Sequence, residues 1–182
     1  MMETFLDLAS RRQSDRAFDP LRPVEPEKLQ YILQAAMLSP SACNAQPYKL
    51  IVVDDVELKN KVADTTSSRI LGMNHFTKQA PVHIVIVEEN PNLTSGIGGF
   101  VKDKHFPYID IGIVAAHITL AAADCGLGSC ILGWFDEKKL HELLSIPSRK
   151  RILLDIVIGY SVQPLRVKKR KDFDKLVSRN KY

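Results

Sequence analysis

Hydrophobic residues at helical spacing mark two amphipathic segments in the N-terminal part of the chain. Residues 2–10 place Met2, Phe5, Leu6 and Ala9 on one helical face. A second helix is expected to begin near Pro26, because proline suits a first turn, and to stop at Ser39-Pro40, because a residue before proline avoids helical geometry. Its buried face has the spacing of a core-facing helix and consists of Leu29, Ile32, Leu33, Ala36 and Met37.

The rest of the chain alternates between apolar runs of strand length and helical patterns. The predicted strands are Lys49 to Val53, His83 to Val87, Ser129 to Leu132, and Ile152 to Tyr160. The predicted helices are residues 56–65, residues 108–125, which Gly126 ends, and a segment that Asp136 caps and Pro147 ends. Residues 88–107 are rich in glycine and proline, and a loop of that length is usually a lid or a binding segment. This order, without repeats or linkers, predicts one α+β domain over residues 1–182.

Charge is distributed unevenly over the 182 residues, whose formal net charge is +4. Residues 166–182 contain eight basic and two acidic residues, a net charge of +6, so the remainder carries −2. A basic segment of this kind can bind nucleic acid, a membrane surface or a phosphorylated small molecule, or it can be a solvated end. The slightly acidic body has no nucleic-acid recognition motif, so we expect no nucleic-acid partner.

The cysteine content and the apolar stretches favour a cytoplasmic protein. The three cysteines form no C-x-x-C pair, as is typical of reduced proteins. The N-terminus has no long apolar region, so we expect no signal peptide. The longest apolar stretch, residues 109–123, contains Asp110 and His117 and is shorter than the roughly 20 residues that span a bilayer. We therefore expect no membrane partner.

Several common kinds of site are missing from the sequence. No G-x-G-x-x-G follows a strand and no G-x-x-x-x-G-K occurs, so neither a dinucleotide fold nor a P-loop is expected. The five histidines are scattered without zinc-ligand spacing. There is no G-x-S-x-G motif, and nothing in the sequence places Cys43 in a hydrolytic triad. We expect no metal site.

Four separated segments resemble the signature segments of the nitroreductase family, in the same order and across the whole chain. They are residues 11–18 (RRQSDRAF), 39–48 (SPSACNAQPY), 126–136 (GLGSCILGWFD), and 158–160 (IGY) followed by the basic run 168–171 (KKRK). The resemblance implies an α+β fold with a central mixed, mostly antiparallel sheet flanked by helices. It also implies a long central helix at a homodimer interface and a C-terminal segment, residues 161–182, that extends onto the partner subunit.

The resemblance further implies an FMN cofactor whose phosphate is held by both ends of the chain. Arg12, Gln13 and Ser14 fall where the family grips the ribityl phosphate, and Lys168 and Arg170 fall where it places C-terminal phosphate ligands. Arginine and lysine make short, charge-assisted hydrogen bonds to phosphate. The basic tail would therefore have a defined role in cofactor binding.

Other residues would meet the flavin ring. Arg16 falls where a cation approaches the pyrimidine and favours the reduced flavin. Gly133 and Trp134 fall where backbone N–H groups face N5 and O4, and Asn74 is a further candidate for the pyrimidine edge. The residues expected to reach the flavin from the partner chain are Pro40, Ser41, Ala42 and Asn44.

The implied activity is an NAD(P)H-dependent oxidoreductase that reduces nitroaromatics, quinones or similar acceptors. Because the flavin performs the hydride chemistry, no catalytic side chain is required. With one flavin and no second cofactor domain, donor and acceptor would share one face in a ping-pong cycle. The alternatives are a non-enzymatic FMN-binding or storage module and a specialised flavin reductase for enone reduction or dehalogenation.

Three positions depart from the commonest family pattern. Gln13 separates arginine from serine, Cys43 stands where glycine is frequent, and Trp134 replaces a small residue. Trp134 can narrow the substrate pocket, stack on an aromatic acceptor, or pack in an interface. Cys43 can lie near the flavin or be an inert thiol.

Overall fold

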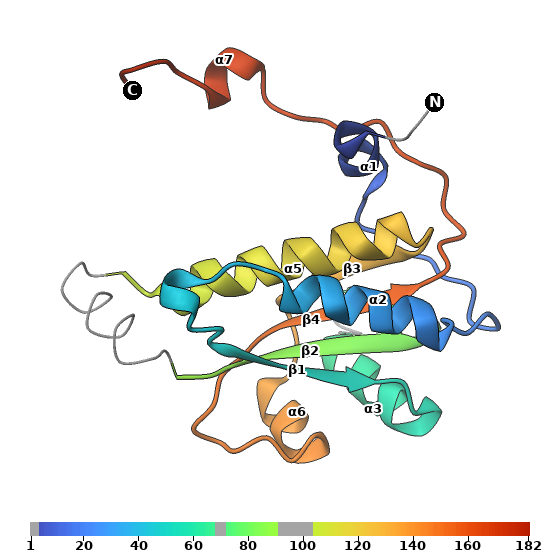
Figure 1. Ribbon diagram of the computed structural model, residues 1–182. Helices are drawn as coiled ribbons and strands as arrows, with labels where there is room; N and C mark the ends of the chain where they lie inside the picture. Colours follow the sequence, from blue (N-terminus) through green and yellow to red (C-terminus); the bar gives the residue numbers. More distant parts are fainter. Residues whose placement is uncertain (1–3, 68–71, 91–103) are drawn as a thin grey trace.

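A four-stranded sheet forms the centre of the structure, a computed structural model that describes residues 4–67, 72–90 and 104–182 (Figure 1). The strand order is β1-β2-β4-β3, and each neighbouring pair is antiparallel. The strands are β1 (Tyr48–Val53), β2 (Val82–Glu88), β3 (Gly128–Leu132) and β4 (Ile152–Gly159). The strand register places Ile84 opposite Ile156, and neither is exposed.

Helices cover both faces of this sheet. The long helix α5 (Phe106–Asp124) and α2 (Pro26–Met37) pack together on one face, where Ile84 and Ile86 point. The opposite face, where Val85 and Val87 point, is covered by α3 (Val56–Thr66), the short 3-10 helix η2 (His75–Gln79) and α6 (Glu137–Leu143). Coverage on both sides explains why β2 is apolar from Ile84 to Val87 rather than alternating.

Local signals set the helix boundaries. Thr4 and Asp7 form a capping box at the start of α1 (Phe5–Arg11). Asp136 caps α6 by accepting a hydrogen bond from Lys139 N at 3.1 Å, as predicted. After α5 the chain turns at Gly126, whose φ of +73° lies in the left-handed region that glycine tolerates.

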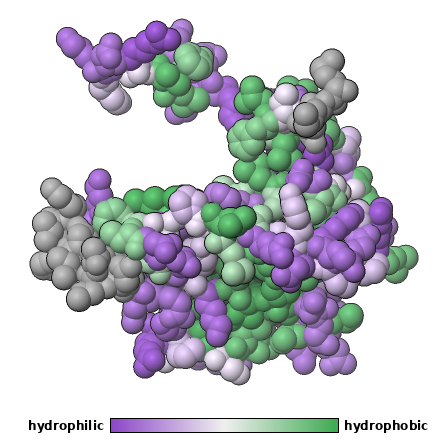
Figure 2. Space-filling view, in the orientation of Figure 1, coloured by the Kyte–Doolittle hydropathy of each residue, from purple (hydrophilic) through white to green (hydrophobic). Residues whose placement is uncertain are grey.

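The two ends of the chain meet beside β3 and β4. The segment after α1 forms a parallel bridge from Ser14 to Ser129, and Phe18 forms an antiparallel bridge to Ser161. After β4 the chain continues as an extended arm, residues 161–182, which contains α7 (Phe173–Leu176). The end of this arm, with α7, stands clear of the body (Figures 1 and 2). Residues close to both termini therefore shape one edge of the molecule.

The predicted fold class is confirmed, and most predicted boundaries agree closely with the structure. The four strands pair only antiparallel, and the Ser14–Ser129 bridge is the single parallel pairing in the described residues. The predicted loop 88–107 is shorter at both ends, because Glu88 belongs to β2 and α5 already begins at Phe106. Residues 91–103 of that loop lie outside the described residues.

Helix α5 is the one helix in the described ranges that is long and apolar enough to cross a membrane. However, 56% of its most apolar window is buried inside the protein. Val114 and Ile118 are fully buried in the cluster with the sheet and α2. We therefore regard α5 as a core helix of this domain.

Candidate functional site

A strongly basic groove lies between the segment after α1 and the C-terminal arm. It has a volume of about 390 Å³, and six of its nine lining residues are basic while none is acidic. Residues more than 150 positions apart in the chain therefore converge. The groove contains the five residues predicted to meet the phosphate and Arg16, whereas Asn74, the further candidate for the pyrimidine edge, is not among the lining residues. The lining residues are Arg12, Gln13, Ser14, Arg16, Arg166, Val167, Lys168, Lys169 and Arg170.

Hydrogen bonds from side chains to backbone oxygens attach the arm to the N-terminal segment. Lys168 Nζ donates to Ser10 O at 2.5 Å and also to Arg12 O. Arg166 donates to Ser14 O through its guanidinium group. Because an ammonium group has three donors, Lys168 keeps one for a ligand.

The charges in the groove are suited to an anion. Burial lowers the pKa of Lys168, and the neighbouring Arg12, Arg170 and Arg166 lower it further. Within the described parts of the chain, the guanidinium groups of Arg12 and Arg16 and the Ser14 hydroxyl have no hydrogen-bond or ion-pair partner. These are the donor types that phosphate prefers, so the residues fit a phosphate group.

Gly133 and Trp134 lie at the other end of β3 from this groove. The Ser14–Ser129 bridge fixes the groove at the start of the strand, and four residues of strand from Ser129 to Gly133 span about 13 Å. Trp134 is 55% exposed. An elongated ligand with its anionic end in the groove could therefore reach Trp134 by lying along β3.

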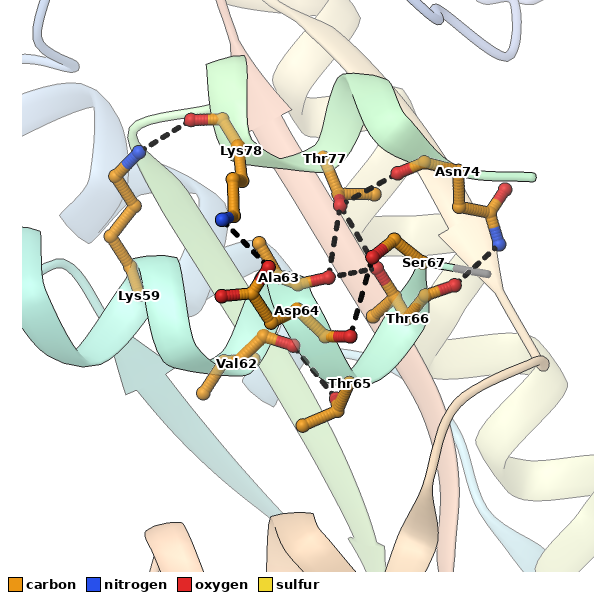
Figure 3. A network of polar contacts seen from close by, with 10 residues as sticks. All are labelled: Lys59, Val62, Ala63, Asp64, Thr65, Thr66, Ser67, Asn74, Thr77 and Lys78. Carbon is orange, nitrogen blue, oxygen red and sulfur yellow. Dashed lines mark hydrogen bonds and ion pairs between the residues drawn. The ribbon is translucent and has the colours of Figure 1, made fainter. Parts of the chain in front are cut away.

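Asn74 belongs to a polar network that joins η2 to α3 (Figure 3). Its Nδ2 donates to Thr66 O at 3.1 Å, and the hydroxyl groups of Thr66 and Thr77 are 2.9 Å apart. Asp136 N donates to Thr65 O at 2.8 Å, which places this network beside the segment after β3. Asn74 thus lies near the Gly133–Trp134 region, with its side-chain amide already bonded to the end of α3.

The loop that contains the predicted partner-chain ligands has an unusual backbone. Around the 3-10 helix η1 (Ala42–Asn44), φ is +52° at Cys43, +52° at Asn44 and +44° at Gln46. Such left-handed conformations in non-glycine residues gather at functional sites. Asp110 of α5 holds the loop by accepting a hydrogen bond from Ala42 N at 3.0 Å.

Within a single chain, this loop and the basic groove lie at opposite ends of α5. The Ala42–Asp110 bond attaches the loop to the beginning of α5, whereas Arg11 donates to Ala123 O, at 2.6 Å, near its end. Thirteen residues of helix separate Asp110 from Ala123, or about 20 Å. Pro40, Ser41, Ala42 and Asn44 therefore do not line the groove of their own chain, and their contribution from a partner chain stays a prediction.

The second face of α5 is apolar and open to solvent. Tyr108 and Ile109 are each 53% exposed, and Ile131 of β3 is 41% exposed. The small residues Gly112 and Ala116 line a hollow beside Ile131. Contiguous exposed apolar surface of this kind marks interaction sites, which agrees with a partner packed against α5.

Comparison with known proteins decides the family. Residues 9–72 and 68–160 match the model of the nitroreductase family. The chain belongs to the nitroreductase family. The match ends at residue 160, so the structure alone brings Lys168 and Arg170 to the groove of this nitroreductase-family protein.

Individual relatives are similar to this nitroreductase-family chain over nearly its whole length. An FMN-dependent nitroreductase from Clostridium difficile has a TM-score of 0.77 and 30% identity, covering 98% of this chain and 100% of that one. An oxygen-insensitive NADPH nitroreductase from Helicobacter pylori is 27% identical, covering 92% and 95%. An iodotyrosine deiodinase from Thermotoga neapolitana is 27% identical, covering 90% and 91%.

The sequence did not single out two residues that shape the groove of this nitroreductase-family chain. Asp15 is only 3% exposed, although an acid within the polar run 11–16 reads as a surface residue. Arg166 bonds to the N-terminal segment, although nothing distinguishes it from the other basic residues of the tail. No sequence signal separates these two residues from their neighbours, because their roles depend on a meeting of distant segments.

Proposed function

We propose that this protein is an FMN-dependent NAD(P)H oxidoreductase that reduces nitroaromatics, quinones or similar acceptors in a ping-pong cycle. The observation that carries the proposal is the basic groove, to which both ends of the chain contribute basic side chains without any acidic lining residue. Family membership and the FMN- and NAD(P)H-dependent relatives support the cofactor and the electron donor.

The chain's own residues would divide the binding of FMN between them. Arg12, Ser14, Lys168 and Arg170, with Gln13 beside them, would surround the phosphate, as their convergence in the groove suggests. Arg16 would face the pyrimidine and stabilise negative charge there. Gly133 and Trp134 would offer backbone N–H groups to the ring, and the partner would contribute Pro40, Ser41, Ala42 and Asn44.

Bound FMN would supply the hydride-transfer chemistry. The protein would bind and orient the reactants and exclude water, so we propose neither a catalytic side chain nor a metal. The apolar face of α5 supports a homodimer. We further propose that residues 161–182 reach over the partner and that the protein is cytoplasmic, as the family resemblance and the cysteine content suggest. We propose no nucleic-acid or membrane partner.

Steady-state kinetics with the FMN-loaded protein test this function. We expect NADH or NADPH oxidation that depends on a quinone or nitroaromatic acceptor, with parallel double-reciprocal lines. Intersecting lines would contradict the ping-pong order. FMN binding without NAD(P)H oxidation would instead favour the storage module.

A specialised reductase is the second candidate, and reductive dehalogenation is its best-supported form. The deiodinase relative, similar over 90% of this chain, favours it. Release of iodide from iodotyrosine by the reduced protein, at a rate comparable to quinone reduction, would establish this activity. The same assay with a conjugated enone would test enone reduction.

A further inference from the structure

The carboxylate of Asp15 is buried beneath the basic groove and uses both of its oxygens. Oδ1 accepts hydrogen bonds from Gln13 Nε2 at 2.9 Å and Ser161 Oγ at 2.6 Å, and Oδ2 accepts one from Ser129 N at 3.3 Å. A Cβ atom at Gly128 would lie 2.8 Å from Oδ2. Asp15 is therefore wedged between the start of β3 and the residue range that follows β4.

Gln13 extends this contact to the C-terminal arm. Its Nε2 also donates to Pro164 O at 3.2 Å, while its Oε1 accepts from Arg166 N at 3.1 Å and from Arg166 Nε at 3.4 Å. The amide orientation follows from these neighbours, because the Asp15 carboxylate requires a donor and Arg166 requires an acceptor. Both N–H donors and both lone pairs of Gln13 are thus in use, and a ligand could bind them only by displacing a bond.

Between Pro164 and Lys168 the arm is attached at alternate residues. Pro164, Arg166 and Lys168 bond to the N-terminal segment, whereas Leu165 and Val167 are 65% and 94% exposed. This period of two is that of an extended chain with one face held. Ser161, Val162 and Gln163 are bonded first, to Asp15, Ala17 and Arg16. The contacts of Gln13 with Pro164 and Arg166 come next and carry this register on to the basic residues that follow.

The cations of the groove oppose this arrangement. Lys168 lies close enough to Arg12, Arg166 and Arg170 for each of them to disfavour its charged form. Like charges held together without a ligand repel one another, so the hydrogen bonds of Lys168 and Arg166 to the N-terminal segment are opposed by this repulsion until an anion binds. The buried, fully bonded Asp15–Gln13 pair is placed to keep the arm docked against this repulsion.

We infer that Asp15 and Gln13 are positioning residues: they dock the arm through Pro164 and Arg166 so that the cations converge, and Gln13 is not itself a phosphate ligand. The inference rests on the proposed function only for the identity of the ligand, FMN. The docking itself is a property of the unliganded chain.

The test exchanges the two side-chain chemistries. Gln13→Glu sets a carboxylate against Asp15, which breaks the pair. Adding Asp15→Asn restores one donor and one acceptor with their direction reversed, and returns the net charge to that of the wild type. Gln30→Glu, the same change on an exposed position of α2, controls for the change in net charge.

Two readouts separate docking from binding. Amide hydrogen exchange of residues 163–170 is measured without FMN, and the dissociation constant of FMN is measured by quenching of its fluorescence. For Gln13→Glu we expect exchange to be faster and FMN binding weaker, each by roughly tenfold. The double variant is expected to recover part of both, because the carboxylate introduced at position 13 can again pair with residue 15 and accept from Arg166 but cannot donate to Pro164 O. Gln30→Glu is expected to change neither. Thermal unfolding confirms that each variant is folded.

Three results would overturn the inference. Unchanged exchange in Gln13→Glu together with weaker FMN binding would make Gln13 a direct ligand. Faster exchange with unchanged FMN affinity would show that docking of the arm does not contribute to FMN binding. If neither the exchange rate nor the FMN affinity recovers in the double variant, the contact between residues 13 and 15 does not dock the arm. If the wild-type protein binds no FMN, the proposed function fails, while the exchange data still test the docking.

Discussion

In the middle of the sheet, Ile84 and Ile156 face each other with no exposed surface, whereas every residue lining the basic groove is at least partly exposed. The sheet is stabilised by apolar burial on both faces, at about 25 cal/mol per Å² of apolar surface removed from water. The groove is held by hydrogen bonds between the two chain ends, each contributing only about 1 kcal/mol net.

This difference separates stability from binding. Changes in the sheet should lower the free energy of unfolding whether or not a ligand is present. Changes in the groove should leave folding almost intact and act on the affinity for the anion. Single substitutions in each region, each with a matched control, test that separation.

The largest effect is expected at the buried pair between β2 and β4. His83 Nδ1 lies 2.8 Å from Asp155 Oδ2, and neither side chain is exposed. Because His83→Leu leaves the Asp155 carboxyl group without its partner, we expect a loss of about 3–5 kcal/mol in urea unfolding. The exposed Asp54→Ala at the end of β1 is the control. A loss below about 1 kcal/mol for His83→Leu would show that this pair is not essential to the sheet.

In the groove, Arg12→Ala should lower the affinity for FMN and leave the free energy of unfolding almost unchanged. Removing one charge-assisted ligand is expected to weaken FMN binding by about 1.5–3 kcal/mol, or roughly ten- to a hundredfold. The urea midpoint should hardly change, as for the exposed control Arg149→Ala. If Arg12→Ala lowers the free energy of unfolding by as much as it weakens FMN binding, the groove contributes to folding and cannot be separated from the sheet in this way.

A smaller effect is expected in the η1 loop. Cys43 has a φ of +52°, a conformation that glycine adopts more readily. Cys43→Gly should therefore raise the free energy of unfolding by up to about 1 kcal/mol, whereas Cys125→Gly, at the end of α5, should not stabilise. If Cys43→Gly instead lowers the free energy of unfolding, the Cys43 side chain contributes more stability through its contacts than its left-handed backbone conformation costs.

The smallest effect concerns pH. Burial and the neighbouring cations lower the pKa of Lys168, and a bound phosphate would raise it again. The charged form thus binds better, so FMN affinity should fall by a few-fold as the pH rises through this pKa. Lys168→Arg stays charged and should flatten the profile. If the wild type and Lys168→Arg show the same dependence of FMN affinity on pH, the group that titrates is not Lys168.

The helices and strands could be predicted from the sequence because their signals are local. Pro26 begins α2 and Asp136 caps α6 as the pattern indicated. The pairing of His83 with Asp155 could not be predicted, since it depends on the register between β2 and β4. Each residue alone is a single polar position within an apolar strand.

The groove was predicted in part. The resemblance indicated Arg12 and Lys168 as residues of one site, and the structure brings them together. The roles of Asp15 and Arg166 arise only when the two chain ends meet, so no spacing in the sequence encodes them. The contribution of the partner chain stays a prediction.

A protein that carries FMN and accepts hydride from a nicotinamide donor must change colour when that donor is added. The most direct test is the visible absorption spectrum of the FMN-reconstituted, desalted protein, recorded without oxygen before and after addition of NADH or NADPH. We predict flavin bands that remain with the protein through desalting and bleach on addition of at least one donor. A protein that retains no FMN, or retained flavin that neither donor bleaches, would contradict the proposed function.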